Sequence, residues 1–417
     1  MDHRMEIVAA IVFALALIHT FTAKSFEILS NRHPNHAGLF HLLGEVEVVF
    51  GFWAFILIAL LAIFAGSDKA ITYVESRHYT EPMFVFVVMV VAASQPVLGV
   101  VRGLITLTAK IMPINNTLAQ VWLSLAAVPL LGSLITEPAA MTIAALMLAP
   151  QVFKQGMPEW LKYAALGVLF VNISIGGTLT SYAAPPVLMV AKAWEWDSAF
   201  MASTFGWKAA IAVLINATVV CYMLRQHLVN IKDSIAPLGK IKTPVMVSVI
   251  HILFLIGVVV FAHHPVIFFG LFLFFLGFTQ AYERYQSPLI LKEGLLVGFF
   301  LAGLVVLGGM QQWWLQPIVS SLAPLQLFFG AVALTAITDN AALTFLGSQI
   351  VGLSDMAKYM LMAGAISGGG LTLIANAPNP AGAALLKKGF DDGSIGAGQL
   401  LLGALPPTIV AAVLFLI

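Results

Sequence analysis

Long apolar runs recur from one end of this chain to the other, and they restrict the folds open to it. Two examples are VFGFWAFILIALLAIFAG at 49–66 and VIFFGLFLFFLGF at 266–278. A helix needs roughly 20 apolar residues to cross a bilayer, and only helices or closed barrels satisfy their backbone there. Because the runs do not alternate with a period of two, they indicate helices. The sequence therefore predicts an all-α polytopic membrane protein.

The apolar windows predict ten spans in a chain of 417 residues that is 60% hydrophobic and 9% charged. Their predicted positions are 5–23, 39–65, 83–104, 160–192, 203–224, 244–262, 264–282, 289–310, 357–387 and 396–417.

Two further windows, 117–152 and 319–352, have polar residues and small residues near their middles. They read LLGSLITEPAAMTIAAL and ALTAITDNAALTFLG. Two of the predicted spans are also interrupted, at ISIGGTLTSYAAPP within 160–192 and at ISGGGLTLIANAPNP within 357–387. Glycine clusters and prolines cannot continue a helix smoothly. We expect the first pair to be re-entrant hairpins and the second pair to be helices unwound near the membrane midplane.

The order of these features predicts an internal repeat. Thr136, Ala139, Ala140 and Thr142 align with Thr338, Ala341, Ala342 and Thr344 at a single offset of 202 residues, and the same offset pairs Glu137 with Asp339. Each of the two segments is followed by a glycine-rich interruption. We therefore expect a first repeat at 1–225, a cytoplasmic linker at 226–243 and a second repeat at 244–417.

The distribution of basic residues supports an inverted second repeat. With two hairpins, each half contains five spans, and an odd number of spans inverts the second half. One side of the membrane then carries Lys24, Arg32, Arg102, Lys110, Lys154, Lys162, Arg225, Lys232, Lys240, Lys242, Arg284, Lys292, Lys387 and Lys388. The other side carries only Arg4, Lys69, Arg77, Lys192 and Lys358. The positive-inside rule places the larger group in the cytoplasm, so both termini are predicted to lie outside a cytoplasmic (inner) membrane.

Asp339 and Glu137 are the candidate ion-binding and proton-exchanging residues. A carboxylate at membrane depth is costly, and it usually marks an ion pathway or a proton relay. The alternative is that each acid only caps the second helix of its hairpin. Thr136, Thr338 and Asn340 add oxygens at the same tips, either as sodium ligands or as local caps.

Polar residues in the two unwound helices complete the predicted sodium site. Thr180, Thr372 and Asn376 can supply oxygens from across the repeat axis, and Ser181 and Asn379 lie beside them. They can equally satisfy backbone groups that the interruptions leave unpaired. Glu45, Glu47 and Glu293 have a more peripheral position, as part of a second proton path, a subunit contact or the membrane interface.

Other classes of function lack a motif. The single cysteine, Cys221, excludes an intramolecular disulfide and a cysteine-based metal site. The sequence has no G-x-S-x-G, Walker A or dinucleotide-binding pattern, and its basic residues form no run suited to nucleic acid. The loops are too short for an ATPase. The sequence thus predicts a secondary transporter with no cofactor rather than an enzyme, since inverted repeats with broken helices are typical of such proteins.

TEPAAMT and TDNAALT, each followed by a glycine-rich interruption, resemble the ion transporter superfamily, and within it the sodium/proton antiporters of the NhaD type. This resemblance implies a homodimeric scaffold, elevator-like movement of the hairpins, and an ion site at Asp339, Asn340 and Thr338 with Glu137 as its repeat partner. Dicarboxylate carriers of the superfamily have Ser-Asn-Thr at both tips. Here the tips read Ile-Thr-Glu-Pro and Ile-Thr-Asp-Asn, which argues against such a substrate.

The main hypothesis is exchange of Na⁺ or Li⁺ for H⁺, with both cations competing for the Asp339 and Glu137 carboxylates. The alternative is a sodium-coupled symporter of a small organic anion, in which helix ends hold the anion. The absence of arginine from the tips and the broken spans weakens that alternative. A metalloid-anion efflux permease fits the same fold, and an intramembrane enzyme lacks a nucleophile with a base.

Overall fold

Residues 3–228, 243–391 and 393–417 are described by a computed structural model of the chain, without the side chains of eleven positions between 21 and 47. Every element in this described part is helical. By length and composition, six of its helices can cross a membrane, or eight if each bent pair is counted as one span. The all-helical prediction is confirmed. Most of the predicted linker at 226–243 lies outside the described residues, including Lys232, Lys240 and Lys242. The side chains of Lys24 and Glu47 also lie outside the described part.

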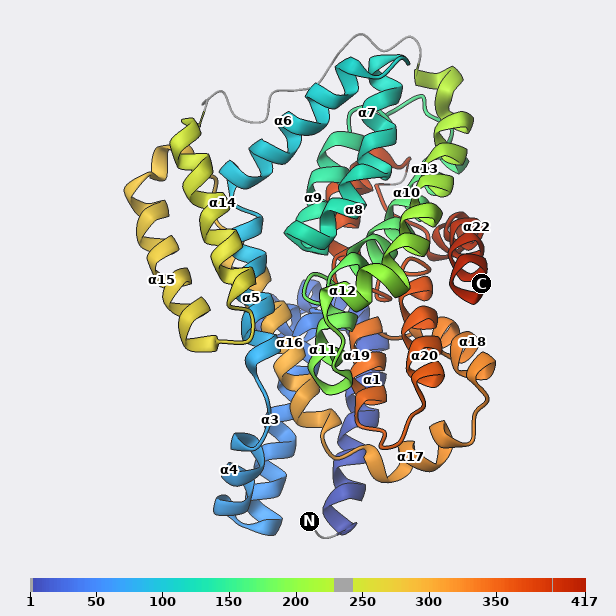
Figure 1. The fold of residues 1–417 in the computed structure, drawn as a ribbon. Helices are drawn as coiled ribbons and strands as arrows, with labels where there is room; N and C mark the ends of the chain where they lie inside the picture. Colours follow the sequence, from blue (N-terminus) through green and yellow to red (C-terminus); the bar gives the residue numbers. More distant parts are fainter. Residues whose placement is uncertain (1–2, 229–242, 392) are drawn as a thin grey trace.

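One group of helices packs around α3 and α16, with α5 joining them to α14 and α15. Figure 1 shows this group in the blue and yellow parts of the chain. Its members are α1 (His3–Arg32), α2 (Ala37–Gly44), α3 (Val46–Ala65), α4 (Ser67–Glu75), α5 (Thr80–Ala92), α14 (Val245–Val260), α15 (Pro265–Ala281) and α16 (Leu291–Gly308). Glycines allow α3 and α16 to pack closely, because a methyl group on Gly303 of α16 would lie 2.4 Å from the backbone nitrogen of Gly51 on α3.

A second group carries the predicted hairpins and broken helices. Its members are α7 (Asn116–Leu125), α8 (Ala127–Ile135), α9 (Glu137–Leu148), α10 (Glu159–Gly176), α11 (Pro185–Trp194), α12 (Ser198–Met201), α13 (Trp207–Leu228), α18 (Pro324–Thr335), α19 (Asn340–Ser348), α20 (Asp355–Gly368), α21 (Asn379–Leu386) and α22 (Ala397–Leu416). Two helices lead from the first group into the second, α6 (Gln95–Ile111) and α17 (Gln312–Ser320) (Figure 1).

Both interrupted windows turn back on themselves. In the first, a methyl group on Gly132 of α8 would lie 3.2 Å from Cβ of Ala140 on α9, so the turn falls at Thr136. The two ends of this hairpin meet where Gln151 Nε2 donates to Gln120 Oε1 at 2.8 Å. In the second, α18 contacts α19, and the flanking residues Gln316 and Val351 exchange two hydrogen bonds of 2.8 and 2.9 Å.

The two predicted interruptions in spans 160–192 and 357–387 are confirmed. The helix of the first span ends at Gly176 and resumes at Pro185, and that of the second ends at Gly368 and resumes at Asn379. The two interruptions cross each other. Ser174 Oγ donates to the carbonyl of Ile366 at 2.7 Å, and a methyl group on Gly370 would lie 2.5 Å from the backbone nitrogen of Val171.

Two spans predicted as single helices are not single. Residues 83–104 bend by 64° between α5 and α6, because Ser94 is extended and Pro96 has no N–H to donate to the preceding turn. Residues 39–65 are interrupted at Glu45, whose backbone is extended between α2 and α3. The first helix also continues past the predicted end at 23, to Arg32.

Candidate functional site

Glu137 begins α9 at the tip of the first hairpin and is 0% exposed. Its carboxylate turns away from its own helix. Oε2 accepts a 2.9 Å hydrogen bond from Asn376 Nδ2, which comes from the interruption between α20 and α21. Oε1 has no hydrogen-bond partner among the described residues and lies against Gly177, where a methyl group would be 2.6 Å away. The first hairpin thus presents a buried carboxylate to both broken helices.

Thr136, directly before Glu137, has a backbone conformation that β-branched residues rarely adopt. Its φ is +78°, and such a conformation costs on the order of 1–3 kcal/mol. Thr136 makes no side-chain cap to α9, and its hydroxyl is buried without a hydrogen-bond partner among the described residues. A strained tip with an unsatisfied oxygen is typical of a ligand-binding turn.

Asp339 occupies the equivalent tip of the second hairpin with a different geometry. Its Oδ1 accepts from the backbone nitrogens of Ala341 at 2.8 Å and Ala342 at 3.2 Å, so it caps α19. Asp339 is half-buried. The capping role considered for both acids therefore holds for Asp339, whereas Glu137 directs its carboxylate to Asn376 in the second broken helix.

Asn340 follows Asp339 and is completely buried. Its backbone nitrogen donates to the carbonyl of Ala375 at 3.1 Å, while both polar atoms of its side chain lack a hydrogen-bond partner among the described residues. A methyl group on Gly369 would lie 3.0 Å from its Nδ2. The Asn340 side chain therefore sits where the two broken helices cross.

Asn376 and Asn379 bring two more amides from the second interruption, and both are 0% exposed. Asn379 Nδ2 donates to the carbonyls of Gly369 at 2.7 Å and Thr372 at 2.9 Å. The side-chain oxygens of both asparagines remain without a partner in the described part of the chain. We call Thr136, Glu137, Asn340 and Asn376 the tip cluster. Together they offer buried, unsatisfied oxygens of the kind that hard cations prefer.

The predicted threonines have other positions. The hydroxyl of Thr180 donates to the carbonyl of Ser133 at 2.7 Å, and that of Thr372 to the carbonyl of Ala336 at 2.9 Å. Each therefore joins a broken helix to the hairpin that precedes it in the chain. Thr338 lines an apolar cavity of about 340 Å³ between α1, α17 and the second hairpin.

Two serines that were not among the predicted site residues also shape the site. Ser133 Oγ donates to the carbonyl of Gly176 at 2.7 Å and accepts from the backbone nitrogen of Leu179. Ser174 makes the bond across the helix crossing. A serine within an apolar run gives no signal of its own, because only its position opposite a helix interruption makes it necessary.

Two peripheral acids lie among the helices packed on α3 and α16. Glu45 Oε1 forms a 3.2 Å ion pair with Lys292 Nζ, which joins the break after α2 to the start of α16. Glu293, which directly follows Lys292 in the chain, is exposed.

Comparison with known proteins identifies the family of the chain. The family model described as "Putative Na+/H+ antiporter" matches residues 4–417. A search of curated proteins found no match to the chain. The apolar helices and the family together indicate a multi-pass membrane transporter rather than an enzyme. Because the match covers nearly its whole length, the chain belongs to the family described as Na⁺/H⁺ antiporters.

Proposed function

We propose that this chain exchanges Na⁺ or Li⁺ for H⁺, and that the two cations alternate at the tip cluster. The observation that carries the proposal is the Glu137 carboxylate, which is fully buried and has one oxygen without a partner among the described residues. A buried carboxylate is stable only when a proton, a cation or hydrogen-bond donors compensate its charge. One donor, Asn376 Nδ2, is present, so a proton or a sodium ion completes the compensation.

The surrounding oxygens favour a dehydrated alkali cation in place of the proton. Thr136 Oγ1, Asn340 Oδ1 and Asn376 Oδ1 are buried without partners in the described residues. They would replace part of the hydration shell, while Asp339 adds negative charge from the second tip. The two acids lie one at each hairpin tip. Loss of the proton from this pair and binding of Na⁺ would keep the buried charge nearly constant.

Contacts between the two halves support an inverted repeat. The start of α9 meets the second interruption through Glu137 and Asn376. The helix α19 meets the start of α11, directly after the first interruption, through Thr344 Oγ1, which donates to the carbonyl of Pro186 at 2.9 Å. Within each half, Thr180 and Thr372 make the corresponding bonds to their hairpins. This correspondence supports repeats at 1–225 and 244–417 and re-entrant hairpins at 117–152 and 319–352.

We further propose an elevator-like movement, in which the hairpins and broken helices carry the site past α1–α5 and α14–α16. The few connections between the groups, chiefly α6 and α17, favour such a division (Figure 1).

The resemblance to antiporters of the NhaD type suggests that α1–α5 and α14–α16 also form a homodimer. The charge distribution suggests an inner membrane with both termini outside. The family description favours exchange over sodium-coupled uptake of an organic anion.

The test is sodium-driven proton movement in sealed proteoliposomes that contain the full chain and a trapped pH dye. Addition of Na⁺ or Li⁺ outside should raise the external proton concentration and alkalise the lumen, whereas K⁺ should have a smaller effect. Glu137→Gln should abolish the response, and Glu293→Gln, at an exposed acid on α16, should retain it. Vesicles that hold folded protein and show no cation-dependent pH change would contradict the proposal.

A further inference from the structure

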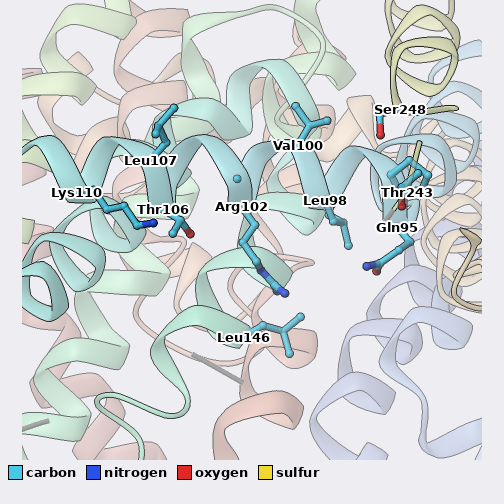
Figure 2. Close-up of a pocket in the computed structure, with 13 residues that line it drawn as sticks. Gln95, Leu98, Val100, Arg102, Thr106, Leu107, Lys110, Leu146, Thr243 and Ser248 are labelled. Atoms are coloured by element: carbon cyan, nitrogen blue, oxygen red, sulfur yellow. The ribbon is translucent and has the colours of Figure 1, made fainter. Parts of the chain in front are cut away.

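A cavity of about 740 Å³ lies along one face of α6, far in sequence from the hairpin tips (Figure 2). Residues at steps of three or four along the helix form its floor: Gln95, Gly99, Arg102, Gly103, Thr106 and Lys110. This spacing places them on one side of the helix. A methyl group at Gly99 or Gly103 would meet no heavy atom within 4 Å, so the floor is open to a ligand.

The charge in this cavity is of one sign. Arg102 is half-buried with its Nε unpartnered among the described residues, and Figure 2 shows its guanidinium directed away from the axis of α6 into the open space. Lys110 and the Thr106 hydroxyl lie along the same helix. None of the described lining residues is acidic. The arginine fork matches the oxygens of a phosphate group, and Thr106 and Lys110 add a hydroxyl and an ammonium group farther along the same cavity.

The position of α6 favours a lipid as the source of that phosphate. Apolar side chains beside the cavity face outward, with Leu104 54%, Leu107 62% and Ile111 78% exposed. The 64° bend after α5 turns this amphipathic helix away from the direction of the preceding helix. Such a helix lies in the membrane interface, with its apolar face in the acyl chains and its basic face at the headgroups. Basic pockets between helices at this level suit anionic headgroups.

We propose that the α6 cavity binds the phosphate group of an anionic phospholipid, with Arg102 and Lys110 as the charged contacts. The walls come from three parts of the fold: α6 itself, Leu146 near the end of α9, and Ser248 on α14. A lipid in this cavity would therefore contact the first hairpin and the helices around α3 and α16 at once. It would stabilise their relative position independently of the cation at the tip cluster.

The test measures phosphatidylglycerol bound to the full-length protein in detergent micelles by native mass spectrometry. Phosphatidylcholine serves as the neutral lipid, and glycerol 3-phosphate serves as a headgroup without acyl chains. R102Q and K110Q should each weaken phosphatidylglycerol binding about tenfold, equivalent to about 1.4 kcal/mol, because each removes a charged contact to the phosphate. K388Q, at an exposed lysine outside the cavity, should leave the affinity unchanged.

Two results would overturn the proposal. One is phosphatidylglycerol affinity in both R102Q and K110Q within twofold of the K388Q value. The other is glycerol 3-phosphate binding as tightly as the lipid, which would assign the cavity to a soluble phosphate ester. Lys110 is exposed, so K110Q should fold normally. If R102Q fails to fold, the K110Q result alone decides the test. Sodium-dependent proton flux serves as a separate readout and is not required for the result.

Discussion

Asn376 Nδ2 donates a 2.9 Å hydrogen bond to Glu137 Oε2, although 239 residues separate the two in the chain. Each residue sits at an interruption of helical structure, one at a hairpin tip and the other in a broken helix. The bond joins the two halves of the chain at a point that excludes water, since both residues are 0% exposed.

Asn376→Ala should weaken sodium binding more than it weakens the fold. The substitution removes the donor to a buried carboxylate and one unsatisfied oxygen, an effect of about 1–3 kcal/mol. We expect the KM for Na⁺ to rise roughly tenfold in proteoliposome flux assays. Asn216→Ala is the matched control, because Asn216 is a buried amide that bonds Asn172 and Pro407 on other helices. An equal rise in KM in both variants would argue against a specific role for Asn376.

Substitutions of Asp339 separate its capping role from its charge. Asparagine and serine are good helix N-caps, whereas alanine at such a position costs about 1 kcal/mol of stability. Asp339→Asn and Asp339→Ser should therefore keep the thermal stability of the protein, and Asp339→Ala should lower it. All three should lose sodium-dependent proton flux at least tenfold. If the Asn and Ser variants instead keep nearly wild-type flux and only the Ala variant loses it, Asp339 would act only as a helix cap.

Gly177→Ala should block the site without removing any ligand. The added methyl group would lie 2.6 Å from Glu137 Oε1 and 2.7 Å from its Cγ, so the carboxylate must move. We expect a loss of flux of about tenfold or more, because overpacking of this kind costs roughly 1–3 kcal/mol. Gly277→Ala on α15 is the control, since nothing lies within 4 Å of a methyl group there. Comparable flux in the two variants would show that the position of this carboxylate does not matter.

Competition between the two cations predicts a specific dependence on pH. If one proton must leave before one Na⁺ binds, the apparent KM for Na⁺ should rise roughly tenfold for each unit of acidification, by mass action. The rise should level off at alkaline pH, where the site is deprotonated, and the maximal rate should change less than the KM. Initial rates of dye response over a series of pH values measure this. A KM for Na⁺ that is independent of pH would be incompatible with a shared site.

Much of this fold follows from the sequence, because apolar length and glycine or proline interruptions act locally. The interruptions at Gly176 and Gly368 and the turn at Thr136 were predicted from such signals. The bend at Ser94 was not, since the apolar run continues through it while Pro96 breaks the hydrogen bonding.

The different roles of the two aligned acids were also beyond the sequence. The shorter side chain of Asp339 reaches the first amides of its own helix, whereas Glu137 begins its helix one position later and extends to Asn376. Two features produce this difference: Asp339 precedes the first residue of its helix whereas Glu137 is the first residue of its own, and the Glu137 side chain is longer by one methylene group. Asn376 was predicted as a site residue, but its bond to Glu137 depends on the packing of distant segments, as does the contact of Ser174 with Ile366.

The most direct test of the account is proton release when Na⁺ binds to the purified protein in weakly buffered detergent solution. The account predicts that Na⁺ or Li⁺ releases protons from wild-type protein near the pH at which exchange operates. Glu137→Gln should release none, and Glu293→Gln should behave as wild type. Saturable binding of Na⁺ to wild-type protein without proton release, or full release from Glu137→Gln, would contradict the claim that the two cations share this carboxylate.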